Sequence, residues 1–228
     1  MPTVENPPPP VATEQDPPYP LTFTVDYPEK LDRITTLLRL FYLIPIVIVV
    51  GLLTSGTVSL GADASHEAWR SGAYFSAAGV GILFWPVLLM LVFRRKYPRW
   101  WFDWNLNISR FTARVGAYAL LLRSDYPSTD EEQAVHLDFA YPDATQLDQV
   151  LPIFKWFLSI PHYFVLFFLW IGAWFCTVIA WFAILFTGRY PKAMFEYVVG
   201  VMAWTLRVQA YAFLLITDRY PPFSLKYP

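Results

Sequence analysis

"YPKAMFEYVVGVMAWTLRVQAYAFLLITD" occupies residues 190–218, and "YPRWWFDWNLNISRFTARVGAYALLLRSD" occupies residues 97–125. A shift of 93 residues, from 97 to 190, aligns the two stretches without a gap. The shift matches Tyr97-Pro98 with Tyr190-Pro191, Phe102 with Phe195, Arg114 with Arg207, Tyr118 with Tyr211 and Asp125 with Asp218. Chance rarely produces so many matches in register, so the sequence predicts an internal duplication.

The duplication extends upstream of these stretches. "FTVDYPEKLDRITTLLRLFYLIP" (23–45) parallels "LDFAYPDATQLDQVLPIFKWFLSIP" (137–161), which places Asp32, Arg39, Ile44 and Pro45 on Asp148, Lys155, Ile160 and Pro161. We therefore predict two repeats, 21–127 and 135–228, joined by an acidic, solvated linker at 128–134. The alternating stretches 21–27 and 135–141 predict one half-buried β-strand per repeat, and the two strands are expected to pair at the cytoplasmic surface.

Composition indicates a membrane protein. Hydrophobic residues make up 56% of the chain and charged residues 15%, against roughly 25% charged residues in soluble domains. Aromatic residues make up 19%, which suits the membrane interface. There is no basic field for nucleic acid. The Pro-rich residues 1–20 predict a disordered tail rather than a signal peptide, and the single cysteine, Cys176, predicts a buried thiol without an internal disulfide.

Two segments of the first repeat are apolar enough to span a bilayer, 37–54 and 72–93. "RRKYPR" (94–99) follows the second segment and places that end in the cytoplasm by the positive-inside rule. The loop 55–71 then faces outward, and both chain termini are expected in the cytoplasm. These features predict a multi-pass protein of the bacterial cytoplasmic membrane.

The second repeat lacks the outer loop. Residues 157–186 form an uncharged run that would extend about 45 Å as a single helix, longer than the bilayer core. We therefore predict a membrane hairpin over about 153–186, turning near Trp170-Ile171-Gly172. A single tilted helix is the alternative.

"RYP" at 189–191 follows this run. Proline ends a helix and favours an extended residue before it, so Arg-Tyr-Pro predicts a turn at the interface followed by a new helix. A basic Tyr-Pro pair precedes two such helices. The first is expected at about 100–122, where aromatic and charged residues form opposite stripes, and the second at about 193–216, packed against protein. The predicted fold class is an all-α integral membrane protein in which each repeat is a transmembrane helical hairpin plus an interfacial helix, with short β-strands at the cytoplasmic surface.

Three groups of polar residues are candidate sites. Across an axis relating the repeats, Asp103 could meet Arg207, and Glu196 could meet Arg114. Such a charged seam would serve gating or ion passage; the alternatives are a structural salt bridge between the repeats or contacts with lipid headgroups. His162 lies at the start of an uncharged run. Its candidate roles are a proton relay, a haem or metal ligand, and a hydrogen-bonded interfacial side chain. Six cations are candidate contacts for lipid headgroups or topology signals: Arg94, Arg95, Lys96, Arg99, Arg189 and Lys192.

The chain has no nucleophile with its base, phosphate loop or metal-binding cluster among its motifs. We therefore expect no catalytic residues, no cofactor and no bound metal. The expected function is that of a non-catalytic accessory or scaffold subunit of a larger membrane complex, with the lipid bilayer and other membrane proteins, or further copies of this chain, as partners. The alternatives are a small transporter or channel built on the repeat, and a lipid-binding or membrane-shaping protein.

The stretches "AILFTGRYP", "RVQAYAFLLITDRYPPFSL" and "FKWFLSIPHYFVLFFLWI" resemble the bacterial, actinobacterial-type membrane proteins of domain-of-unknown-function family 4389. The resemblance runs from about residue 20 to the C-terminus as two tandem copies and is strongest in the second. It implies a membrane protein with a tandem repeat, and it brings no activity or catalytic residues with it.

Overall fold

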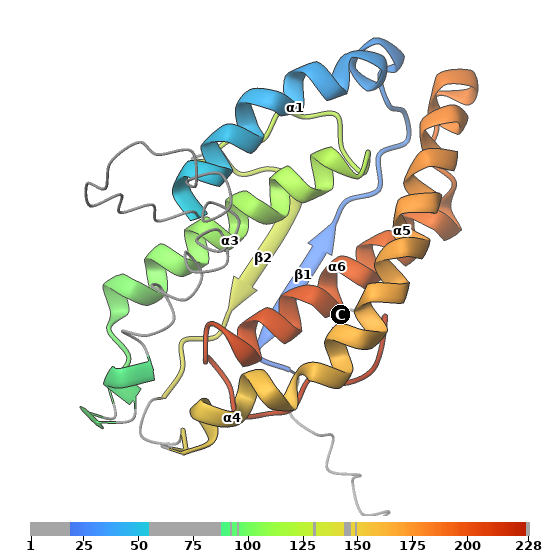
Figure 1. Ribbon diagram of the computed structural model, residues 1–228. Helices are drawn as coiled ribbons and strands as arrows, with labels where there is room; N and C mark the ends of the chain where they lie inside the picture. Colours follow the sequence, from blue (N-terminus) through green and yellow to red (C-terminus); the bar gives the residue numbers. More distant parts are fainter. Residues whose placement is uncertain are drawn as a thin grey trace, which may run out of the picture.

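The computed structural model describes residues 19–54, 88–91, 93–94, 96–129, 131–143, 147–148 and 150–226 (Figure 1). The expected outer loop 55–71, nearly all of the tail 1–20, most of the span 72–93, and Arg95 lie outside these residues. The elements in chain order are β1 (Leu21–Val25), α1 (Arg33–Thr54), α3 (Arg99–Ala119), β2 (Val135–Phe139), α4 (Leu151–Leu158), α5 (Ile160–Thr187) and α6 (Lys192–Ala212). The fold is therefore mostly helical with a small sheet.

The two predicted strands pair with each other, as expected. β1 and β2 are antiparallel, with Leu21 opposite Phe139 and Val25 opposite Val135. Side chains alternate along each strand, so that Phe23 and Leu137 are buried while Asp138 is exposed. The sheet thus has one apolar face toward the protein and one polar face away from it.

The elements form three layers. β1 packs on α6 and β2 packs on α3, and these two helices in turn carry α5 and α1. Figure 1 shows the strands between α3 and α6, with α1 and α5 further out. The polar face of the sheet and the α1–α5 layer therefore form opposite faces of the molecule.

The Arg-Tyr-Pro turn is confirmed. α5 ends at Thr187 and is followed by Gly188, whose φ of 72° is the left-handed conformation that suits glycine at a helix C-terminus. Pro191 is extended (ψ 124°) and α6 begins at the next residue. Pro98 does the same for α3 (ψ 127°). The limits of α3 and α6 are related by the 93-residue shift found in the sequence.

The hairpin predicted in the second repeat is wrong. α5 is a single helix of 28 residues, and Gly172 lies inside it. A Cβ atom at Gly172 would lie 2.6 Å from the hydroxyl of Tyr197. The glycine therefore allows α6 to approach α5 closely and does not form a turn. The chain breaks earlier, at Ser159 between α4 and α5, just before Pro161.

α1 has a comparable break. It bends by 56° between Arg33–Arg39 and Phe41–Val50, and Pro45 lies within the second of these parts. By length and composition, Leu151–Thr187 could cross a membrane, and the bent α1 is a second such segment if its two parts count as one span.

The two halves exchange equivalent contacts. Tyr27 follows β1 and donates a hydrogen bond to the carbonyl of Tyr190, whereas Tyr141 follows β2 and donates to the carbonyl of Tyr97. The ring of Tyr27 lies 5.0 Å from that of Phe195, and the ring of Tyr141 lies 5.2 Å from that of Phe102. Each strand is therefore fastened to the long helix of the other half.

The apolar stripe of α3 packs largely against protein, whereas an interfacial helix was predicted here. Phe111, Val115 and Tyr118 belong to the apolar stripe of the predicted interfacial helix, but they are buried and pack against Ile46 of α1. Trp100 and Trp104 are exposed. Protein contacts thus cover much of the apolar face of α3. The predicted packing of the last helix against protein is confirmed, since most of α6 is buried.

Candidate functional site

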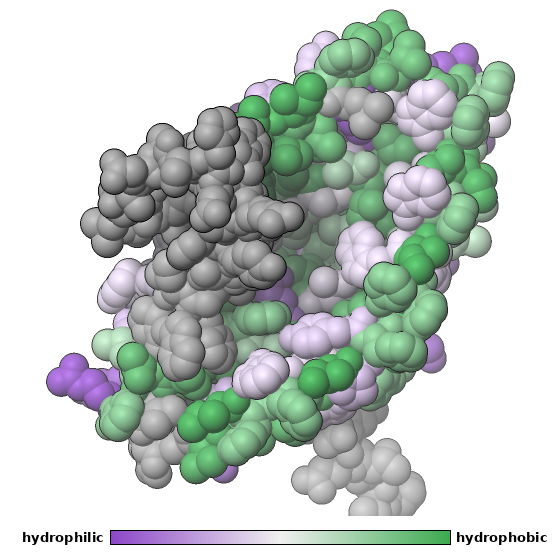
Figure 2. Space-filling view, in the orientation of Figure 1, coloured by the Kyte–Doolittle hydropathy of each residue, from purple (hydrophilic) through white to green (hydrophobic). Residues whose placement is uncertain are grey.

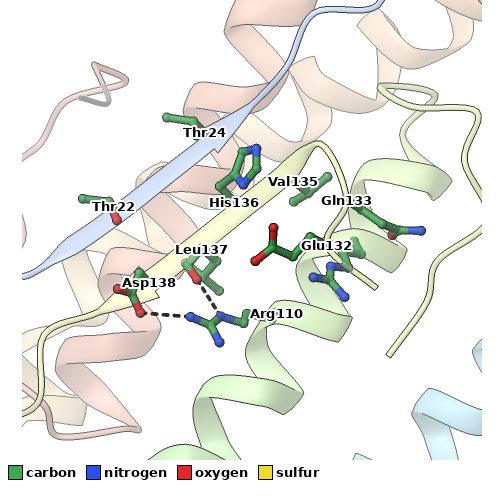
Figure 3. Close-up of a pocket in the computed structure, with 10 residues that line it drawn as sticks. Thr22, Thr24, Arg110, Glu132, Gln133, Val135, His136, Leu137 and Asp138 are labelled. Carbon is green, nitrogen blue, oxygen red and sulfur yellow. Dashed lines mark hydrogen bonds and ion pairs between the residues drawn. The ribbon is translucent and has the colours of Figure 1, made fainter. Parts of the chain in front are cut away.

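A polar pocket of about 310 Å³ lies on the outer face of the sheet. Thr22, His136 and Asp138 line it from the strands and Arg110 from α3, as Figure 3 shows. The Arg110 Nε donates to the carbonyl oxygen of Leu137 (2.9 Å), and its Nη2 lies 3.1 Å from the Asp138 carboxylate. The charge of Arg110 is therefore neutralised within the pocket, and the pair holds α3 against β2.

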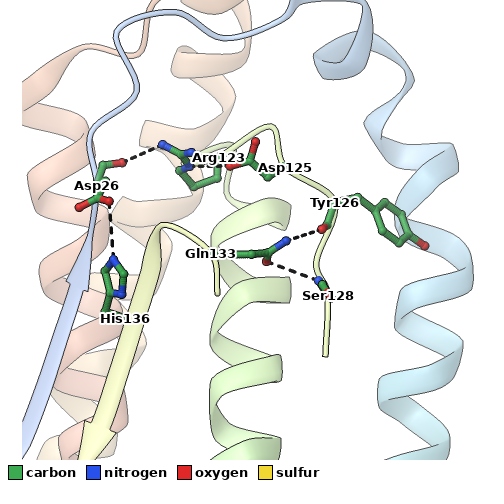
Figure 4. A network of polar contacts seen from close by, with 7 residues as sticks. All are labelled: Asp26, Arg123, Asp125, Tyr126, Ser128, Gln133 and His136. Atoms are coloured by element: carbon green, nitrogen blue, oxygen red, sulfur yellow. Dashed lines mark hydrogen bonds and ion pairs between the residues drawn. The ribbon is translucent and has the colours of Figure 1, made fainter. Parts of the chain in front are cut away.

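A surface network closes one end of the sheet (Figure 4). Asp26 lies 3.6 Å from the imidazole of His136 and accepts a hydrogen bond at its carbonyl from Arg123, which also binds Asp125. Gln133 of the predicted linker donates to the carbonyl of Tyr126 (2.7 Å). Exposed pairs of this kind contribute little free energy of folding. Their arrangement orders the linker and provides no nucleophile with a base.

The predicted charged seam is not formed among the described residues. Asp103 and Glu196 are exposed. The Arg114 Nη1 donates to the carbonyl of Ser128 (2.8 Å), and the Arg207 Nη2 donates to the carbonyl of Ser224 (2.6 Å). Both arginines therefore hold nearby chain segments through backbone carbonyls, and neither makes the expected ion pair.

The candidate headgroup cations lie in two places. Arg99 lies over the ring of Tyr141 (5.5 Å) and Lys192 over the ring of Tyr27 (5.4 Å). Because the strands are antiparallel, these tyrosines follow opposite ends of the sheet. Arg94, Lys96 and Arg189 are exposed.

Tyr97, which follows the cations 94–96 and precedes Pro98, is part of the core. Tyr97 is buried, and its hydroxyl donates to the carbonyl of Leu214 (2.9 Å). Burial raises the pKa of the Tyr97 hydroxyl, which keeps it protonated as a donor.

His162 is fully buried at the start of α5. Its Nδ1 accepts a hydrogen bond from the Trp204 indole (3.1 Å), and its ring stacks on Phe223 with the centroids 4.0 Å apart. Of the alternatives considered, this geometry matches the hydrogen-bonded histidine. In the described part of the chain, no three His, Cys, Asp or Glu side chains form a group that could hold a metal ion.

Two buried cations occupy equivalent positions that the sequence aligned but did not identify as sites. Lys155 is 0% exposed; its Nζ donates to the carbonyl of Thr217 (2.8 Å) and lies 2.6 Å from the Asp218 carboxylate. Arg39 is 4% exposed, and its Nη1 donates to the carbonyl of Tyr118 (2.8 Å). Each cation also faces a tyrosine ring: Arg39 that of Tyr118 at 4.4 Å, and Lys155 that of Tyr211 at 5.3 Å.

One signal could have identified these cations. A charge within an apolar run is expensive unless it is paired, and both occur at the same repeat position. What the sequence does not reveal is the partner, because Asp218 follows Lys155 by more than sixty residues.

Comparison with known proteins adds a family match for part of the chain. Residues 152–224 match the family model described as "Domain of unknown function (DUF4389)", and one copy is found. This region contains α5, α6 and most of α4. No curated protein and no solved structure matches the chain.

Proposed function

We propose that this protein is a non-catalytic integral membrane protein that serves as an accessory or scaffold subunit of a larger membrane complex. The observation that carries the proposal is the outer face of α5. Large apolar side chains lie exposed along its length, among them Phe164, Phe168, Phe175, Phe182 and Phe186. Figure 2 shows hydrophobic side chains over this helix and along the lower edge of the molecule.

Water is an unfavourable surrounding for such a face. A soluble monomer rarely exposes an apolar patch larger than a few hundred Å², whereas this one follows a helix of 28 residues. Its aromatic composition suits lipid and the apolar surfaces of other membrane proteins. A bilayer covers the face directly, and a partner subunit replaces lipid over part of it.

The order of the layers supports a particular orientation. β1 follows α6 along its length, since Tyr19 donates to the carbonyl of Arg207 and Tyr27 to that of Tyr190. If α5 crossed the bilayer beside α6, the polar sheet face with Asp138 would lie at hydrocarbon depth, where exposed charges are costly. We therefore propose that the α1–α5 face is immersed, that the sheet faces the cytoplasm, and that both ends of α5 lie on the sheet side.

Site-directed labelling tests this orientation. In a Cys176→Ala background, Val150→Cys and Arg189→Cys place single thiols at exposed positions beyond the two ends of the α4–α5 segment. Both are expected to react with an impermeant maleimide from the cytoplasmic side only, as is the exposed control Thr129→Cys in the linker. Labelling of positions 150 and 189 from opposite sides would show that α5 crosses the membrane and would exclude the orientation.

Native mass spectrometry tests the accessory role. The protein is extracted from its own membrane in mild detergent, and the particle mass and co-purifying chains are determined. We expect a defined complex containing other membrane proteins in reproducible stoichiometry. A lone chain or a homo-oligomer would contradict the accessory role and redirect attention to the transporter and lipid-binding alternatives. Carbonate extraction provides the control for membrane embedding, since an embedded protein stays in the pellet.

We also propose that residues 21–127 are a second, diverged copy of the domain matched at 152–224. Three observations support it. α3 and α6 begin and end at positions related by the same shift of 93 residues; Tyr27 and Tyr141 make equivalent contacts with the other half; and buried cations occupy equivalent positions. Each of these features joins one half to the other or recurs in both. Duplication would therefore explain why the two strands pair across the halves.

A further inference from the structure

The two buried cations differ in one respect. Lys155 has the carboxylate of Asp218 at 2.6 Å, but Arg39 has no carboxylate partner among the described residues. Asp125 stands at the position equivalent to Asp218, yet it pairs with Arg123. The residue equivalent to Arg123 in the second half is Ile216, which cannot compete for the acid. Among the described residues, Arg39 therefore lacks the carboxylate partner that Lys155 has.

Arg39 also has free hydrogen-bond donors. Its Nη1 is used by the carbonyl of Tyr118, while its Nε and Nη2 are buried and lack a partner within the described chain. These two groups lie on one edge of the guanidinium and point in parallel, which matches two oxygens of a phosphate or carboxylate. A buried, unpaired charge with unused donors is costly, so this edge is suited to an anion.

Arg39 is one of the residues that line a groove of about 340 Å³, a size within the roughly 300–1,000 Å³ range of small-molecule pockets. Arg39 and Leu43 line it from α1, and Trp174, Val178 and Phe182 line it from α5. The three α5 side chains are also exposed on the apolar face. The groove therefore joins a cationic interior to a surface suited to hydrocarbon.

We propose that this groove binds an anionic phospholipid, with its phosphate on the Nε and Nη2 of Arg39 and an acyl chain along Trp174, Val178 and Phe182. The assignment rests on the proposed immersion of the α1–α5 face, where phospholipids surround the groove. The phosphate supplies the negative charge that Asp218 supplies to Lys155 in the other half. A lipid phosphate thus serves as the anion for Arg39, whereas the Asp218 side chain serves as the anion for Lys155.

A lipid titration of the purified full-length protein in detergent, followed by native mass spectrometry, tests the site. We expect phosphatidylglycerol to bind the wild type, and Arg39→Gln to weaken that binding by at least about tenfold, because a two-point charge-assisted hydrogen bond is lost. Val178→Trp, which fills the groove without changing charge, is expected to weaken binding similarly. Arg33→Gln is the matched control in the same helix and is expected to bind within about twofold of the wild type.

Several outcomes would overturn the proposal. Unchanged phosphatidylglycerol binding in Arg39→Gln would remove Arg39 from the site, and tighter binding of oleate than of phosphatidylglycerol would identify a fatty acid instead. Equal loss of thermal stability in Arg39→Gln and Asp63→Asn/Glu67→Gln, with lipid binding unchanged, would identify a carboxylate within the chain as the partner. Because purified protein is used, these results are independent of the labelling and fractionation that test the orientation and the membrane embedding.

Discussion

Asp218→Asn is expected to lower the free energy of unfolding by about 3 kcal/mol. The substitution removes the only carboxylate within salt-bridge distance of Lys155 in the described residues and leaves a fully buried ammonium without a directly paired carboxylate; breaking a buried pair costs about 3–5 kcal/mol. The Asp218 side chain is itself 25% exposed, which favours the lower end of this range. Denaturant unfolding in detergent micelles, followed by tryptophan fluorescence, measures the change.

The repeat supplies a matched control for this prediction. Asp125→Asn makes the same chemical change at the equivalent position, but Asp125 is half exposed and its partner, Arg123, lies at the surface. We expect a change below about 1 kcal/mol. The double variant Lys155→Met/Asp218→Leu is expected to recover most of the lost stability, since apolar residues can replace a buried pair. Equal effects of Asp218→Asn and Asp125→Asn would show that burial of Lys155 does not govern the loss.

Phe23→Ala is expected to lower the free energy of unfolding by about 3–4 kcal/mol. Phe23 is 0% exposed at the centre of β1, and truncating a buried phenylalanine removes apolar contacts and leaves a cavity. The loss should also weaken the junction between the halves, because β1 belongs to the first half and packs on α6 of the second. The same denaturant measurement detects it.

The adjacent residue provides the control. Thr22 lies on the opposite, polar face of β1 and is exposed, so Thr22→Ala is expected to change the free energy of unfolding by less than about 0.5 kcal/mol. Comparable losses from Phe23→Ala and Thr22→Ala would contradict the assignment of the inner sheet face to the core.

Local patterns in the sequence predicted several elements correctly. The alternation in "LTFTVDY" and "VHLDFAY" marked both strands, since a period of two reports which side of a strand is buried. Tyr-Pro after a basic residue marked the start of α3 and of α6, because proline excludes the preceding residue from a helix. Each of these features depends on a few neighbouring residues.

The hairpin in the second repeat could not be excluded in the same way. The length of the apolar run and the position of Gly172 favoured a turn. The residue that explains Gly172 without a turn belongs to another helix. Tyr197 of α6 occupies the space where a side chain at position 172 would lie. The glycine is required by helix packing, and this packing partner is 25 residues further along the chain.

The candidate sites show the same division. Repeat alignment paired Asp103 with Glu196 and Arg114 with Arg207, but equivalent positions in two repeats need not contact each other. The structure instead places both arginines on backbone carbonyls. The alignment of Arg39 with Lys155 has the clearer structural counterpart, since both cations are buried against a tyrosine.

The residue order alone therefore determined the apolar character of the chain, its two strands and its proline-marked helix starts, because these depend on composition and on short-range patterns. Tertiary structure decided that α5 continues through Gly172, that the strands of the two halves exchange partners, and which buried cation has a carboxylate. Those outcomes depend on distances between residues far apart in the chain. Asp218 reaches Lys155 in one half, whereas Arg123 binds Asp125 in the other and leaves Arg39 without a carboxylate in the described structure.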